Sequence, residues 1–232
     1  MRKDLMAQES NSAKSILLRV LIVVIFGIAF AYIEAAVVVY LRVIFHPAGF
    51  TFPLEPFAAN ELGKKLLLTE IGREVATLVL IFTGAWLIGR ISQEKFANFM
   101  IIFAVWDIFY YIWLKLLIDW PASIMDWDIL FLIPLPWASP LLVPLLVSIT
   151  LIVFAIIILY RCSCNKPIKV AKADWAGFIL AALIVVVSLC TAGAHISEAV
   201  YESYFSWPVF ALGLIAAIIL FIKCLLKSPS KI

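Results

Sequence analysis

The chain has 232 residues, of which 65% are hydrophobic and only 14% are charged. Typical soluble domains have roughly 45–50% apolar and about 25% charged residues, so this chain has too few polar side chains to cover a water-facing surface. The composition excludes a soluble globular protein, a disordered chain, a disulfide-rich secreted domain and a nucleic-acid-binding protein. What remains is an integral membrane protein, whose first partner is the lipid bilayer.

Six stretches are apolar over the roughly 20 residues that a helix needs to cross a bilayer. Their approximate ranges are 15–45, 66–89, 97–118, 140–160, 175–194 and 207–226. These runs are continuously apolar and do not alternate with period two, which favours helices over the strands of a membrane barrel. The sequence therefore predicts an all-α, polytopic fold, with one membrane domain over residues 1–232 and a bundle of six transmembrane helices.

The basic residues are distributed unequally between the two ends of these helices. If the N-terminus is cytoplasmic, the opposite side holds only Arg42, Lys64, Lys65, Arg73 and Lys115, which leaves 13 of the 18 basic residues on the cytoplasmic side. The positive-inside rule therefore predicts that both termini are cytoplasmic. The chain has no N-x-S/T sequon and no retention signal, which favours a prokaryotic cytoplasmic membrane.

The acidic residues have the opposite distribution. On the same assignment only Asp4, Glu9, Glu94 and Asp174 are cytoplasmic, which leaves 11 of the 15 acidic residues on the outer side. Acidic residues contribute little to membrane orientation, so insertion does not explain this excess. It points instead to a function on the outer side.

The connection over residues 119–139 is too apolar for a solvated loop. It reads DWPASIMDWDILFLIPLPWAS, and together with Pro140 its prolines at 134 and 136 prevent a continuous helix. We expect residues 127–137 to form a partly buried loop, which lies in the outer interface or dips back into the membrane. Non-helical backbone at that depth must be covered by protein or line a cavity.

Three of the predicted spans each contain a carboxylate, namely Glu34, Glu74 and Asp107. A charge at the centre of a span costs roughly 2.5–3.5 kcal/mol. The helical rise places all three about 12–17 Å from the outer helix ends. We therefore expect them to face one another, a cation or water in an acidic polar cavity that opens to the outside.

Helical spacing adds companions to these carboxylates. Residues three or four positions apart share one face of a helix. Glu70 precedes Glu74 by four positions and Arg73 by three, while Tyr111 follows Asp107 by four. The expected binding cavity therefore consists of Glu34, Glu70, Glu74, Asp107 and Tyr111.

A possible metal site extends this set. If the fifth helix continues through the sequence HISEAVYE, His195, Glu198 and Glu202 form one ridge, and His-x-x-Glu is a spacing that metal-binding bundles use. The metal ligands would then be Glu34, Glu74, Asp107, His195 and Glu198. A carboxylate-rich set favours iron or manganese over zinc. The sequence has no C-x-x-C-H motif, so covalent haem is excluded.

Three functions are compatible with these patterns, and the sequence assigns no catalytic residue. The first is the binding of a cation or small solute, alone or as a subunit of a larger membrane complex. The second is a metal-dependent membrane enzyme that acts on a lipid-like substrate. The third is an accessory subunit that docks a partner membrane protein, with a network of buried ion pairs orienting its helices. In that network Arg42, Arg73 and Lys115 would pair with Glu34, Glu70 and Asp107.

Overall fold

The computed structural model describes residues 2–46, 49–54 and 61–228, and in the first helix it describes the side chains from Leu17 onward. The described chain contains six long helices. They are α1 (Arg2–Phe45), α2 (Glu61–Ile88), α3 (Ser92–Ile118), α4 (Leu142–Ser163), α5 (Lys172–Gly193) and α6 (Trp207–Lys227). All six are long and apolar enough to span a membrane, which confirms the six predicted spans.

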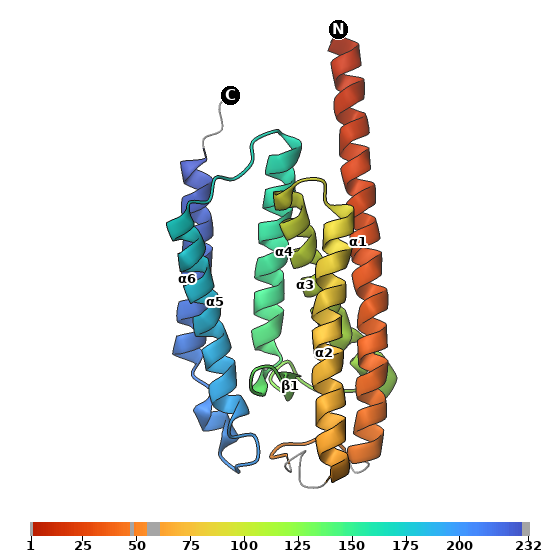
Figure 1. Ribbon diagram of the computed structural model, residues 1–232, viewed down its shortest axis with the longest axis vertical. Helices are drawn as coiled ribbons and strands as arrows, with labels where there is room; N and C mark the ends of the chain where they lie inside the picture. The colour runs from red at the N-terminus through yellow and green to blue at the C-terminus, as the bar shows by residue number, and fades with distance from the viewer. Residues whose placement is uncertain (1, 47–48, 55–60, 229–232) are drawn as a thin grey trace.

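The helices run side by side, and the start of α1 and the end of α6 lie at the same end of the bundle (Figure 1). We call this end the terminal end. The opposite end, where α1, α3 and α5 finish and α2, α4 and α6 begin, is called the hairpin end. At the terminal end α1 projects well beyond the other helices, as Figure 1 shows.

The chain between α3 and α4 is not an irregular loop, and the fold is therefore not purely α-helical. It forms an antiparallel hairpin of β1 (Trp127–Phe131) and β2 (Trp137–Pro140), with a register irregularity between Ile129 and Phe131. The prolines at 134 and 136 lie in the turn, where they interrupt no ladder hydrogen bond. In β1 the aromatic residues Trp127 and Phe131 and the β-branched Ile129 favour a strand.

The hairpin enters the bundle and is covered by protein. The ring of Phe131 lies 6.4 Å from the ring of Phe103 and 6.1 Å from that of Trp106, both well inside α3. On the other side, the backbone of Pro136 packs directly against Gly193 of α5. This confirms the expectation that the connection is partly buried, and strand pairing satisfies part of its backbone.

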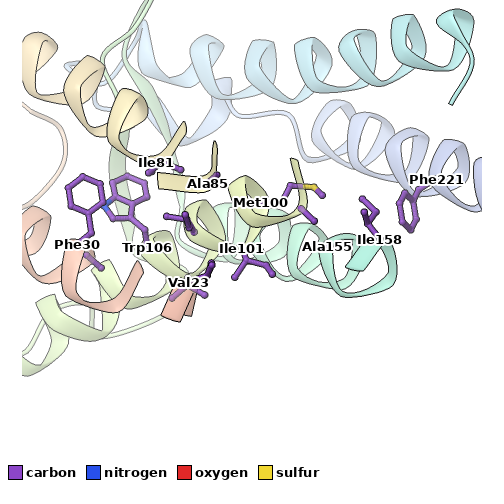
Figure 2. Close-up of a cluster of buried hydrophobic side chains, with 14 of the residues drawn as sticks. Val23, Phe30, Ile81, Ala85, Met100, Ile101, Trp106, Ala155, Ile158 and Phe221 are labelled. Carbon is purple, nitrogen blue, oxygen red and sulfur yellow. The ribbon is translucent and has the colours of Figure 1, made fainter. Parts of the chain in front are cut away.

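The larger of the two buried apolar clusters takes its buried helical residues from five of the six described helices, and the second cluster includes Leu189 and Ala192 of α5. Figure 2 shows buried side chains from α1, α2, α3, α4 and α6, among them Phe30, Ile81, Trp106, Ile158 and Phe221. Phe221 stacks on Phe154 of α4 with ring centroids 3.9 Å apart, which attaches α6 to the rest of the bundle. The core thus fixes the helices around the hairpin.

Helix α5 ends earlier than the metal-ridge hypothesis required. It stops at Gly193, and after a series of turns a short 3₁₀ helix, η1 (Tyr201–Tyr204), precedes α6. The amide of Leu54 donates to the carbonyl of Ile196, so the connection before α2 holds this turn away from the helix axis. The predicted ridge of His195, Glu198 and Glu202 on one continuous helix is wrong.

Candidate functional site

Arg73 joins carboxylates from two helices. It forms an ion pair with Glu34 of α1, while its Nη2 and Nε both lie 2.7 Å from Glu70 Oε2 on its own helix. Thr77, one turn further along α2, donates to the second oxygen of Glu34 at 3.2 Å. Glu34 is only 8% exposed, so this cluster belongs to the interior. The Glu70–Arg73 contact is the one that the spacing of three predicted.

Arg42, in the last turn of α1, makes the second ion pair. Its Nη2 donates to Asp128 Oδ1 of β1 at 3.0 Å. Its guanidinium carbon lies 4.1 Å and 3.7 Å from the ring centroids of Phe50 and Trp120, within the range of cation–π attraction. The expected pairing of Arg42 with Glu34 is wrong, because a partner 86 positions away takes the guanidinium instead.

Glu74 holds the turn of the hairpin. Its two carboxylate oxygens accept the same backbone N–H, that of Leu132, at 3.0 Å and 2.9 Å. The residue is 6% exposed, and no basic side chain in the described part of the chain forms an ion pair with it. A buried carboxylate thus contacts a neutral donor in place of a cation.

Asp107 of α3 is placed in a similar way. Ser148 of α4 donates its hydroxyl to Asp107 Oδ2 at 2.7 Å. Lys115, two turns along α3, was expected to pair with Asp107 but instead contacts Asp119 Oδ1 at 2.6 Å. Within residues 2–46, 49–54 and 61–228, Asp107 therefore also has no basic partner.

Tyr111 lies on the interior side of α3 but contacts none of the carboxylates through its hydroxyl among the described residues. It is 5% exposed and packs against the rings of Tyr110 and Trp120, with centroids 4.9 Å and 6.4 Å away. The neighbouring Tyr110 makes the polar contact, donating to Asp128 Oδ2 at 3.4 Å. Tyr111 therefore serves as packing, and its predicted place in a polar cavity is not supported by any hydrogen bond.

The site has more acid than base. Its carboxylates are Glu34, Glu70, Glu74, Asp107 and Asp128, and its guanidinium groups are those of Arg42 and Arg73. Arg42 neutralises Asp128, and Arg73 neutralises one of the two glutamates that it contacts. Of the remaining carboxylates, Glu74 and Asp107 have no basic partner among the described residues.

The expected metal ligands do not form one group. Glu34, Glu74 and Asp107 each have a different partner, and His195 with Glu198 belongs to the turn after α5. Over the described part of the chain, no three His, Cys, Asp or Glu side chains gather closely enough to hold a metal ion. The carboxylates are separated because each is held by a different element, namely α2, the hairpin or α4.

His195 and Glu198 still meet, although they do not lie on a helix. His195 Nδ1 is 2.7 Å from Glu198 Oε1, and Tyr204 donates its hydroxyl to Glu198 Oε2 at 2.9 Å. The rings of His195 and Tyr204 stack with centroids 3.7 Å apart. The hydrogen bond with His195, and then that from Tyr204, hold the pKa of Glu198 below its usual range.

This contact predicts an acid-sensitive turn. A carboxyl group whose pKa is lowered by folding stabilises the structure above its ordinary pKa, and the stabilisation is lost as the pH falls through the lowered value. We expect the ring resonances of Tyr204 to show an acid transition in the native protein, followed by NMR with labelled tyrosine. Glu198→Gln should abolish that transition, and an unchanged transition in this variant would contradict the assignment.

Two functional side chains and one backbone donor were not predicted from the sequence. Asp128 lies in the connection that was expected to form a loop, Ser148 is a serine within the apolar run of α4, and nothing in the sequence singles out the amide of Leu132. The run of apolar residues around Asp128 was the available signal, because a carboxylate there must find a partner.

Comparison of the chain with protein-family models, with curated proteins and with solved structures found no match.

Proposed function

We propose that this chain is a multi-pass protein of a cytoplasmic membrane that reversibly binds protons at Glu74 and Asp107. The observation that carries the proposal is that neither carboxylate has a basic partner among the described residues, although both belong to helices long and apolar enough to span a membrane. A carboxylate in apolar surroundings with only a neutral hydrogen-bond donor is held in place but is not neutralised. A bound proton restores neutrality without any additional ligand.

The choice of the proton over a larger cation follows from the geometry. Metal ions bind through four or more ligands, and the described carboxylates do not converge in this way. Both oxygens of Glu74 face one amide, and one oxygen of Asp107 faces one hydroxyl. Such single-donor arrangements suit a group that alternates between carboxylate and carboxylic acid.

The paired carboxylates have a different role in this proposal. The ion pairs of Arg73 and Arg42 connect α2 to α1 and α1 to β1, and they therefore fix the walls around the two proton-binding groups. The positive-inside rule predicts that the hairpin end lies on the outer side of the membrane, and protons would then reach the site from outside. The network either serves this chain alone or supplies one proton-binding subunit of a larger membrane complex.

Infrared difference spectroscopy in lipid nanodiscs tests the proposal. A carboxylic-acid band that changes when the external pH is changed is expected in the native protein, because buried acids exchange protons. Glu74→Gln and Asp107→Asn should each remove part of that band. Glu61→Gln, at the exposed start of α2 and paired with Lys64, is the control and should leave it intact. An identical pH-dependent band in all three variants would refute proton binding at these positions.

A further inference from the structure

Three buried donor atoms lack an acceptor in the described part of the chain, and all three border the hairpin. They are Arg42 Nη1, Trp106 Nε1 and Trp137 Nε1. Arg42 is paired with Asp128 of β1, Trp137 belongs to β2, and both indole rings contact Phe131, with centroids 6.1 Å away for Trp106 and 5.3 Å for Trp137. The cluster is therefore tied to one structural element.

These donors differ from a comparable group nearby. Trp113 lies two turns along α3 from Trp106, and its indole N–H donates to the carbonyl of Ile28 at 3.1 Å. Arg42 and Trp106 are 7% and 6% exposed, so the surrounding medium does not satisfy their donors. Buried donors without a protein partner are rare in native proteins, and a bound water or ligand usually explains them.

Acceptors with spare capacity lie on α2 and α3, the two helices that contact the hairpin connection through Glu74 and Trp106. A carboxylate has about four acceptor positions, but Glu74 and Asp107 each receive a hydrogen bond from a single donor among the described residues. The unpaired donors and these carboxylates do not bond to one another. A molecule that both accepts and donates hydrogen bonds would satisfy the two sets together, and water has this property.

We propose that ordered water molecules are bound along the hairpin, where they accept from Arg42, Trp106 and Trp137 and donate to Glu74 and Asp107. Several separate waters suit the site better than one larger ligand, because the donors come from three elements and the ring of Phe131 packs against both indoles. We further assign the path of the proton to these waters, and this assignment rests on the proposed function. Each water accepts one proton and passes one on, so one proton leaves the solvent and one carboxylate becomes a carboxylic acid.

Hydroxyl-radical footprinting of the native protein tests the hydration. X-rays generate the radicals from water, so a buried side chain is oxidised when a bound water lies next to it. We expect Trp106 and Trp137 to be oxidised several-fold faster than Trp113, whose N–H is occupied by Ile28. Oxidation of Trp106 and Trp137 no faster than that of Trp113 would overturn the proposal.

Substitution separates the water path from the proton site itself. Trp106→Phe and Trp137→Phe keep a ring but remove the donor, and they should slow proton exchange at the carboxylates several-fold in time-resolved infrared measurements. Trp113→Phe is the control and should leave the rate unchanged. An unchanged rate of proton exchange together with a raised Tm in Trp106→Phe and Trp137→Phe would show that no water is bound to these two indole N–H groups. That result would overturn the proposed water path. If Glu74 and Asp107 do not titrate, the proposed function fails, while the footprint still decides the hydration.

Discussion

Replacing Arg73 with methionine should lower the free energy of unfolding by about 3 kcal/mol, because it leaves the carboxylates of Glu34 and Glu70 buried without their cation. The side chain of Arg73 is 23% exposed, so the loss should lie at the lower end of the range for a broken buried ion pair. Unfolding in mixed detergent micelles, followed by circular dichroism, measures the change.

The control for Arg73→Met lies on the same helix. Lys64→Met removes a cation whose pair with Glu61 is largely exposed, and such pairs contribute about 0–1 kcal/mol. The double variant Arg73→Met with Glu34→Gln should recover much of the lost stability, since it no longer buries the Glu34 charge. Equal effects of Arg73→Met and Lys64→Met would show that the buried pair does not stabilise the bundle.

Replacing Gly193 with alanine should lower the free energy of unfolding by about 2–3 kcal/mol and displace the turn of the hairpin. A β-carbon on Gly193 would overlap the carbonyl of Pro136, and a backbone group cannot rotate away as a flexible side chain does. The same displacement should break the contact between Glu74 and the amide of Leu132, so the carboxylic-acid band assigned to Glu74 should change as well.

A second glycine provides the matched comparison for Gly193→Ala. Gly72 is in α2, and a β-carbon there would meet nothing within 4 Å. Gly72→Ala should therefore raise stability by up to about 1 kcal/mol, because alanine is the better helix former. If Gly193→Ala were as well tolerated as Gly72→Ala, the close packing of the hairpin on α5 would be disproved.

The spans were predictable because they depend on local composition. A run of about 20 apolar residues must satisfy its own backbone in a membrane, and a helix does so wherever the run occurs. The helix ends shifted by a few residues, since polar residues such as Glu61 and Lys172 extend the helices beyond the apolar run. The contact between Glu70 and Arg73 was likewise predictable, because both residues lie on one turn of one helix.

The hairpin and its contacts were not predictable in the same way. Strand pairing between residues 127–131 and 137–140 depends on a register that composition does not specify. The partners of Arg42, Glu74 and Asp107 lie 86, 58 and 41 positions away. The first two partners, Asp128 and Leu132, belong to the connection that forms the hairpin, and the third, Ser148, belongs to α4. Charge complementarity alone suggested partners for Arg42 and Lys115 on their own helices, but each of these carboxylates lies eight positions away, about 12 Å along the helix axis.

By itself, the amino-acid order specified a protein of six long apolar helices and identified two of its buried acidic side chains, Glu34 and Glu74, but not Asp128. It could do so because hydrophobic burial and helical periodicity act over short stretches of chain. The tertiary structure alone decides which base neutralises which acid and which acids remain without a base. It does so because the hairpin packs between the helices and brings new partners to their side chains. Long-range packing brings Asp128 to Arg42 and the amide of Leu132 to Glu74, and no local pattern encodes distances between segments that are joined only through the folded core.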